Sequence, residues 1–248
     1  MSQRQAVRLS FVSCANQLSV LGQRLLASPC LGPGGQALAV HFNLTSAAQG
    51  FNDAMAAALC GCADNSWLVW VHQDVYLPEG WDETFCAALA QAQVLFPQLA
   101  VAGVYGLTGS GDAARRAGHV LDRGQMLREP MPLPCLVDSL DELLFAVRVD
   151  AGLRLDPALG FDFYATDLVL QAQAAGWQCA VLDACCEHWS DTPASGAIAP
   201  RVVQRIKGSA AVFERKWAQH LPISTPCFNI AKAGDVAAFI DSIVTAAP

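Results

Sequence analysis

The stretch Trp67-Leu-Val-Trp-Val-His72-Gln73-Asp74-Val-Tyr-Leu-Pro-Glu-Gly80-Trp81 decides the fold that we expect of this chain. Its five apolar residues lead directly into three polar ones, and a Pro/Gly turn follows. A short, continuous apolar run of this kind predicts a strand that is buried on both faces of a sheet. The polar residues then lie at the carboxyl end of that strand, where open α/β sheets bind their ligands. Asp74 is therefore a candidate metal ligand; its alternative role is a turn-forming aspartate that accepts backbone hydrogen bonds.

Length and composition restrict the class of protein. A chain of 248 residues fits one large α/β domain with a substantial core. The net charge of −7 argues against a nucleic-acid partner, because nucleic-acid-binding proteins present a basic face. No apolar run approaches the roughly 18 residues of a membrane span, and the first residues lack the apolar segment of a signal peptide. We therefore expect a cytoplasmic protein without a transmembrane segment.

The ten cysteines do not have the spacing of a disulfide framework, so we expect reduced and mostly buried thiols. Cys60-Gly-Cys62 has the wrong spacing for a zinc knuckle and lacks a second pair. The cluster Cys185-Cys186-Glu-His188 combines sulfur and nitrogen, but a zinc site there would need ligands from elsewhere in the chain.

Strand and helix patterns alternate around the opening stretch, which predicts a parallel sheet with right-handed crossovers. The expected strands cover residues 7–12, 36–42, 67–71, 99–105 and 178–182, and the expected helices cover 18–28, 50–59, 81–96, 166–175, 196–220 and 236–244. Residues 106–111 lack the lysine of a P-loop and are expected to form a flexible loop. Residues 118–134 contain three prolines and are expected to be irregular.

These motifs, in this order, resemble those of the GT-A glycosyltransferases, in the bacterial family-two-like branch. The resemblance rests on a first strand, Gly50-Phe-Asn52, His72-Gln-Asp74, Tyr164-Ala-Thr-Asp167 and Glu187-His188, and it covers roughly residues 7 to 190. It implies an α/β GT-A fold with a mostly parallel sheet flanked by helices. Residues 1–105 would form the nucleotide-sugar half, residues 106–195 the acceptor and catalytic half, and residues 196–248 a C-terminal helical extension.

The resemblance also implies a metal site. In the family, the last carboxylate of an Asp-x-Asp motif holds a divalent cation on the diphosphate of the sugar nucleotide. In this chain His72 replaces the first aspartate, Asp74 keeps the metal position, and His188 is the implied second ligand. A shell of histidine, aspartate and phosphate suits Mn²⁺ better than Mg²⁺, which prefers oxygen ligands.

The remaining site residues are likewise implied by the resemblance. The contacts expected with the nucleotide sugar come from Ser13, Asn43, Asn52, His72, Gln73 and Asp138. For Asp138 an ordinary turn or surface role stays open. Asp167 matches the general base of the family's Glu-Asp motif, in which Thr166 replaces the glutamate; its alternative role is to cap the helix that follows.

The expected function is metal-dependent transfer of a sugar, with inversion, from a nucleoside diphosphosugar to a hydroxyl on a glycan, lipid-linked or protein acceptor. Two alternatives stay open. The losses of the first aspartate and of the glutamate before Asp167 favour a catalytically inactive nucleotide-sugar-binding or scaffold protein. A sugar nucleotidyltransferase would instead show a Gly-rich, basic loop after the first strand, where this chain has Ser13-Cys-Ala-Asn16.

Overall fold

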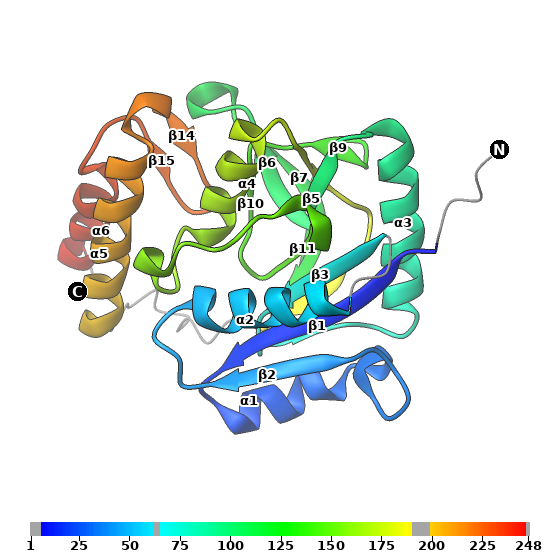
Figure 1. Ribbon diagram of the computed structural model, residues 1–248. Helices are drawn as coiled ribbons and strands as arrows, with labels where there is room; N and C mark the ends of the chain where they lie inside the picture. The colour runs from blue at the N-terminus through cyan, green and yellow to red at the C-terminus, as the bar shows by residue number, and fades with distance from the viewer. Residues whose placement is uncertain (1–5, 62–64, 190–198, 247–248) are drawn as a thin grey trace.

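The structure, a computed structural model, describes residues 6–61, 65–189 and 199–246. Its centre is a seven-stranded mixed sheet (Figure 1). In spatial order the strands are β2 (Leu38–Phe42), β1 (Arg8–Ala15), β3 (Ser66–Val71), β11 (Leu144–Arg148), β5 (Leu99–Gly103), β12 (Gln178–Val181) and β9 (Cys135–Leu136). Strands β11 and β9 run against the other five. The predicted α/β class with a mostly parallel sheet is confirmed, while the GT-A assignment remains a prediction.

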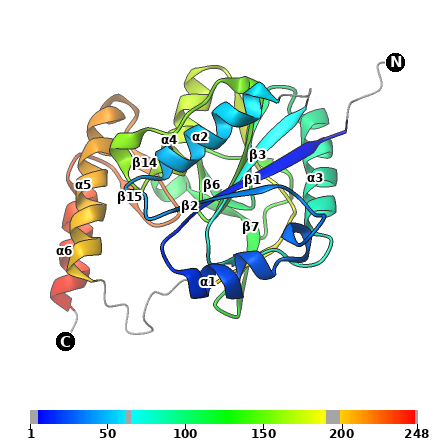
Figure 2. The same cartoon turned by 60° about the horizontal axis from the view of Figure 1, so that its bottom comes forward.

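Helices cover both faces of this sheet (Figures 1 and 2). Helices α1 (Leu18–Gln23) and α3 (Trp81–Leu95) cover one face, and α2 (Ala47–Cys60) and α4 (Tyr164–Ala174) cover the other. Strand β3 contributes Trp67, Val69 and Val71 to the first core and Leu68 and Trp70 to the second. The alternation of side chains along a strand therefore buries both of its faces, as the apolar run predicted.

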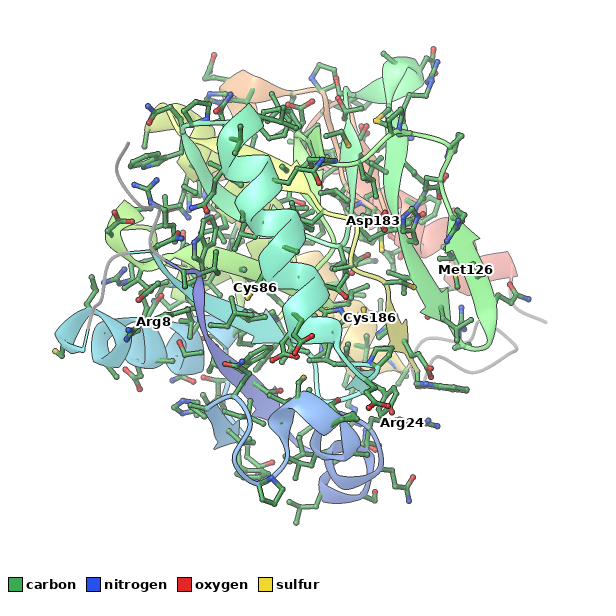
Figure 3. All side chains as sticks on the ribbon, turned by 90° about the vertical axis from the view of Figure 1, so that its right-hand side faces the viewer. Arg8, Arg24, Cys86, Met126, Asp183 and Cys186 are labelled. Carbon is green, nitrogen blue, oxygen red and sulfur yellow. The ribbon has the colours of Figure 1, made fainter. Side chains whose placement is uncertain are left out.

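A second sheet lies beside the first, with the order β10-β6-β7-β13-β4 and β8 paired to β7. Its strands are β4 (Val75–Tyr76), β6 (Tyr105–Thr108), β7 (Arg115–Asp122), β8 (Gln125–Arg128), β10 (Ser139–Leu140) and β13 (Cys186–His188). The expectation of an irregular segment over 118–134 was therefore wrong for residues 118–128, which form the β7–β8 hairpin, and right for residues 129–134, which include the three prolines. The loop expected over 106–111 was wrong for residues 106–108, which belong to β6. Figure 3 shows the β7–β8 hairpin at the edge of the molecule, with Met126 on its outer strand.

The hairpin was missed because its outer strand carries no apolar alternation: all four residues of β8 are exposed. Its turn is nevertheless specified locally, since Arg123 and Gly124 both have positive φ, as a type I′ hairpin turn requires. Gly118 is needed where β7 passes β6, because a Cβ atom there would lie 2.1 Å from the carbonyl oxygen of Val104.

The C-terminal segment forms its own layer at one end of the sheet (Figure 1). It contains α5 (Pro200–Lys216), the β14 (Ile223–Ser224) and β15 (Asn229–Ile230) hairpin, and α6 (Asp235–Ala246). These elements share a third core with Leu159 and Phe163, which precede α4. The predicted boundary between residues 195 and 196 lies outside the described residues. No helix in the described part of the chain is both long and apolar enough to cross a membrane.

Short 3₁₀ turns connect several elements: η1 (Leu25–Ala27), η2 (Pro29–Leu31), η3 (Gly111–Ala113), η4 (Val149–Ala151), η5 (Pro157–Leu159) and η6 (Ala218–His220).

Helix α3 shows how local sequence determines the element boundaries. It begins after Gly80, which has a φ of 72°, and carries Asp82 and Glu83 in its first turn. It ends ahead of Pro97, which cannot continue a helix.

The nine cysteines that the structure describes are all free. Most of them are half-buried rather than buried, as Cys86 on α3 is (Figure 3). Burial raises the pKa of Cys86 to about 11, and the neighbouring charge of Asp82 adds to this effect. Its thiol is therefore protonated at neutral pH, as expected of an unreactive cysteine. Cys62 lies outside the described residues.

Candidate functional site

Three side chains, His72, Asp74 and His188, come together where β3 ends and β13 passes it. The Asp74 Oδ2 atom lies 3.6 Å from His188 Nε2, and Asp74 Oδ1 lies 4.0 Å from His72 Nδ1. One ligand atom from each residue can be chosen so that all three lie within 4.8 Å of one another. The pairing of β13 with β4 sets this arrangement, because it places His188 opposite Val75, next to Asp74. The structure thus joins both predicted metal ligands and adds His72 to them.

The other nitrogen of each imidazole is already bonded. His72 Nε2 lies 2.7 Å from the hydroxyl of Tyr164, and His188 Nδ1 lies 2.9 Å from Asp122 Oδ1. The remaining nitrogens face Asp74, whose Oδ1 atom is buried and has no hydrogen-bond partner among the described residues. Metal-binding histidines are commonly held in this way by an outer partner. The donor set and the bare carboxylate oxygen therefore fit a divalent cation.

Burial lowers the pKa of His72, and the opposing effect of the Asp74 carboxylate is smaller. A depressed pKa keeps this imidazole neutral at neutral pH. Neutral imidazole is the form that binds a metal ion.

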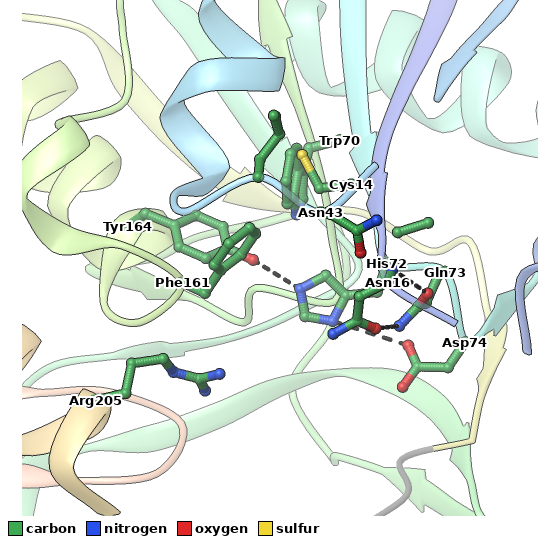
Figure 4. A pocket seen from close by; sticks show the side chains of 12 residues that line it. Cys14, Asn16, Asn43, Trp70, His72, Gln73, Asp74, Phe161, Tyr164 and Arg205 are labelled. Atoms are coloured by element: carbon green, nitrogen blue, oxygen red, sulfur yellow. Dashed lines mark hydrogen bonds and ion pairs between the residues drawn. The ribbon is translucent and has the colours of Figure 1, made fainter. Parts of the chain in front are cut away.

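A first pocket, with a volume of about 210 Å³, opens beside the cluster at the carboxyl ends of β1, β2 and β3 (Figure 4). Asn16, Asn43 and Gln73 bring amide groups to its lining. Gln73 shapes the pocket, because its Oε1 accepts hydrogen bonds from the backbone N–H groups of Asn16 and Gln17, both at 3.0 Å. Figure 4 also shows Arg205 reaching from α5 toward the same space.

Among the predicted nucleotide-sugar contacts, Asn43, His72 and Gln73 line this pocket. Asn16 also lines it, as the family resemblance implied for the Ser13–Asn16 turn; the alternative role of Asn16 was to cap the helix that follows. The N-cap of α1 is in fact Gln17, which makes no capping hydrogen bond through its side chain. An asparagine directly after the first strand of an α/β sheet was the available signal for a pocket residue.

The other three predicted contacts lie elsewhere. Ser13 is fully buried within β1 and does not line the pocket. Asn52 binds the backbone of Leu155 through both its amide nitrogen (2.9 Å) and its amide oxygen (3.0 Å), so it fastens α2 to a loop. Asp138 accepts hydrogen bonds from Gly109 N and Gln173 Nε2 beside a separate cavity. The predicted roles of Ser13, Asn52 and Asp138 therefore do not hold in this structure.

Asp167 was the predicted general base, but its carboxylate faces the protein interior. It is fully buried and accepts hydrogen bonds from Trp217 Nε1 (2.7 Å), Gln171 Nε2 (2.6 Å) and Lys216 Nζ. It lines neither pocket beside the metal cluster. A general base must lie within hydrogen-bond reach of the proton that it takes. This placement does not allow the predicted role, and it makes Asp167 the anchor between α4 and the end of α5.

Capping, the alternative role of Asp167, is also excluded. The N-cap of α4 is Phe163, with a φ of 65°, so Thr166 and Asp167 both lie inside the helix. Thr166 Oγ1 is instead 2.8 Å from the hydroxyl of Ser139, which connects α4 to β10.

We expect an Asp167→Asn substitution to reduce stability rather than turnover. The amide would place N–H hydrogens against the Lys216 ammonium and the Trp217 indole N–H, which leaves buried donors unpaired. The cost should be about 1–3 kcal/mol of unfolding free energy. Urea denaturation of the variant, compared with Asp53→Asn at an exposed position of α2, measures it. An unchanged unfolding free energy together with a collapse of turnover would restore Asp167 as the base.

A second pocket of about 500 Å³ opens on the other side of the cluster. It shares His72, Asp74 and Arg205 with the first pocket, so the cluster lies between the two. Its polar part also contains Asp141, Glu142 and Asp162. These carboxylates make this pocket the acidic side of the site.

Of these three carboxylates, Glu142 is the one suited to accept a proton. Asp162 is bound by the Arg205 guanidinium through two contacts of 3.0 Å, and Asp141 Oδ1 accepts from the backbone N–H of Leu143. The Oε1 atom of Glu142 is buried and has no hydrogen-bond partner in the described part of the chain. Burial raises the pKa of Glu142 well above its usual range, and the charges of Asp162 and Asp141 raise it further. The sequence patterns do not single out Glu142, since the available signal is its place just before the buried strand β11.

Comparisons with known proteins leave the family open. No family model matches the chain. It is 29% identical over 160 residues to "ATP synthase subunits region ORF 6" of Fuscovulum blasticum, a match that covers 61% of this chain and 60% of that protein. The chain thus matches less than two thirds of the length of this curated relative.

Two solved structures are similar at low levels. "A197 from STIV" has a TM-score of 0.47 and 14% identity, with 75% of this chain and 87% of that chain covered. A CMP:2-keto-3-deoxy-manno-octonic acid synthetase complexed with CTP has a TM-score of 0.34 and 13% identity, with 86% and 100% covered. Scores this low do not assign a fold family.

Proposed function

We propose that this protein is a metal-dependent glycosyltransferase that moves a sugar from a nucleoside diphosphosugar to a hydroxyl acceptor. The observation that carries the proposal is the bare Asp74 Oδ1 between two oriented imidazoles, with one pocket on each side. A cation held there would face a ligand in either pocket. The first pocket, which is rich in amides, would take the nucleoside diphosphate, and the second would take the acceptor.

The reaction breaks the bond between the anomeric carbon and the diphosphate oxygen, so negative charge develops on the leaving diphosphate. A divalent cation held by His72, Asp74 and His188 would supply Lewis-acid stabilisation of that charge. Arg205 adds a second positive group, because it lines both pockets. Its guanidinium donates two hydrogen bonds to the Asp162 carboxylate. Two oxygens of a phosphate can accept hydrogen bonds from a guanidinium in the same way.

Glu142 is the proposed base. It takes the proton of the acceptor hydroxyl while that oxygen attacks the anomeric carbon from the side opposite the diphosphate, which inverts the configuration. The geometric support for this role is that Glu142 lines the second pocket and that its Oε1 atom has no hydrogen-bond partner among the described residues. Two histidine nitrogens in the metal shell favour Mn²⁺ over Mg²⁺.

The second candidate function is a catalytically inactive nucleotide-sugar-binding protein, which the replacement of an aspartate by His72 favours. A thermal-shift screen of nucleotide sugars, with and without Mn²⁺, tests binding, because a ligand of the folded state raises the melting temperature. Release of nucleoside diphosphate from the donor that binds then separates the two functions. Binding without release would identify the inactive protein, and no metal-dependent shift with any donor would reject both functions.

Asp122 lines neither the first nor the second pocket, so it provides a test of the metal site that leaves their walls unchanged. We expect Asp122→Asn to weaken Mn²⁺ binding about 10- to 100-fold, the usual effect of losing the outer partner of a ligating histidine. The reason is that His188 Nδ1 would lose its carboxylate acceptor. Isothermal titration with Mn²⁺ measures the change. Asp150→Asn, at an exposed carboxylate paired with Arg148, is the matched control. Equal Mn²⁺ affinities in the two variants would argue against His188 as a ligand.

A further inference from the structure

We propose that the acceptor carries an apolar body beside its reactive hydroxyl, and that this body lies against the C-terminal helices. This inference rests on the proposed function, since it assigns a chemical class to the ligand of the second pocket. It is carried by the division of that pocket into a polar and an apolar side.

The polar side of the second pocket holds the reactive groups. His72, Asp74 and His188 form the candidate metal cluster there, and Glu142 lines the same side, with a buried Oε1 atom that has no hydrogen-bond partner among the described residues. An acceptor hydroxyl must reach this side in order to meet both the base and the donor.

The opposite side consists of apolar side chains from the C-terminal layer. They are Val202 and Ile206 of α5, Pro226 and Phe228 of the β14–β15 turn, and Phe239 and Ile243 of α6. Figures 1 and 2 show α5 and α6 side by side at the same end of the molecule. The apolar surface is thus contributed by segments that are remote in sequence from the metal cluster.

This apolar surface is incompletely covered by the protein itself. Phe239 is 49% exposed although one of its faces meets Phe228, at a centroid distance of 5.8 Å. Ile206 and Ile243 are each partly exposed as well. In contrast, Val236 on the same helix is 1% exposed and belongs to the core, and Ile240, also 1% exposed, is a core residue that lines the pocket. Helix α6 therefore packs Val236 and Ile240 into the core and leaves Phe239 and Ile243 partly exposed at the pocket.

A concave apolar wall beside a few convergent polar groups is the usual form of a small-molecule site. The volume of about 500 Å³ is within the range of such sites. A wholly polar acceptor would leave this wall facing water. An alkyl or aryl group attached to the acceptor would cover it, and each buried methylene adds to affinity through the hydrophobic effect. The chemistry of the pocket thus favours an acceptor with an apolar aglycone over a free sugar.

Two alkyl glycosides test this inference. n-Octyl β-glucoside and methyl β-glucoside offer the same hydroxyls but differ in apolar length. We expect the wild-type protein, with Mn²⁺ and UDP or GDP, to bind the octyl compound at least about tenfold more tightly. Isothermal titration below the micelle-forming concentration measures both affinities. Phe239→Asn should reduce the octyl preference to about threefold or less, while Val94→Asn, at an exposed residue of α3, should preserve it.

Each outcome separates this inference from the proposed function. If Mn²⁺-dependent nucleotide binding is present but octyl and methyl glucosides bind equally, the apolar acceptor is rejected and the proposed function stands. An octyl preference that survives Phe239→Asn also rejects it, because binding then lies elsewhere. If octyl glucoside binds while no nucleotide binds with Mn²⁺, the proposed function fails and the acceptor role fails with it. Retained nucleotide binding in Phe239→Asn shows that this variant is folded.

Discussion

An Asp74→Ala variant is expected to lose Mn²⁺-dependent binding of UDP or GDP while keeping its fold. Removing an outer partner of a metal ligand already costs about 10- to 100-fold, so loss of the central carboxylate should cost more than about 100-fold. Stability should change little, because Asp74 Oδ1 makes no hydrogen bond within the described residues and the strand around it is buried through other side chains. Isothermal titration of the nucleotide with and without Mn²⁺ measures the effect, and thermal unfolding checks the fold.

Asp183→Ala is the matched control for this variant. Asp183 is an exposed carboxylate that also contacts a histidine, since its Oδ1 lies 2.9 Å from His119 Nε2. It lies outside the metal cluster, so its removal should leave the Mn²⁺ effect on nucleotide binding unchanged. A metal-dependent affinity in Asp74→Ala equal to that of the control would reject the metal site.

The second large effect is expected for Glu142→Gln, which should lower sugar transfer by about 10²- to 10⁴-fold, the usual contribution of a general base. The amide has nearly the same shape but cannot take a proton. Affinity for the donor and for Mn²⁺ should stay close to that of the wild-type protein, since the group acts in the transition state. Metal-dependent donor hydrolysis is a usable assay until an acceptor is found. Glu83→Gln, on the exposed surface of α3, is the control.

Glu142→Gln should also change how the unfolding free energy depends on pH, which substitution of a carboxylate without a shifted pKa would not do. The pKa of Glu142 is raised above its ordinary value of 4.5 in the folded state. The protonated carboxyl therefore stabilises the fold fully at a pH below 4.5, and this stabilisation is lost as the pH rises through the folded-state pKa. The neutral amide that replaces the carboxyl does not titrate. The Glu142→Gln variant should therefore gain stability relative to the wild-type protein as the pH rises from about 4 to 8. Urea unfolding at several pH values measures this difference. If Glu142→Gln turned over at the wild-type rate, the role of general base would pass to Asp141 as the next candidate.

The sequence by itself indicated the five parallel strands of the central sheet and placed the polar residues after β3 at its carboxyl edge, but it did not indicate the antiparallel β11 and β9. The apolar run before His72 was sufficient to predict a doubly buried strand, because burial on both faces leaves a continuous apolar pattern that needs no knowledge of partners. The order of the later motifs also indicated that His188 follows a strand near Asp74. In the structure these two residues lie 3.6 Å apart.

Only the tertiary structure decided which polar side chains face the pockets. A carboxylate in the first turn of a helix has the same local pattern whether it faces a cleft or the interior. Asp167 faces the interior because Lys216 and Trp217, about fifty positions later, supply its donors. Glu142 becomes a candidate base because distant segments bury it without giving its Oε1 atom a partner among the described residues. Burial and hydrogen bonding between remote segments set these roles, and local sequence patterns do not record them.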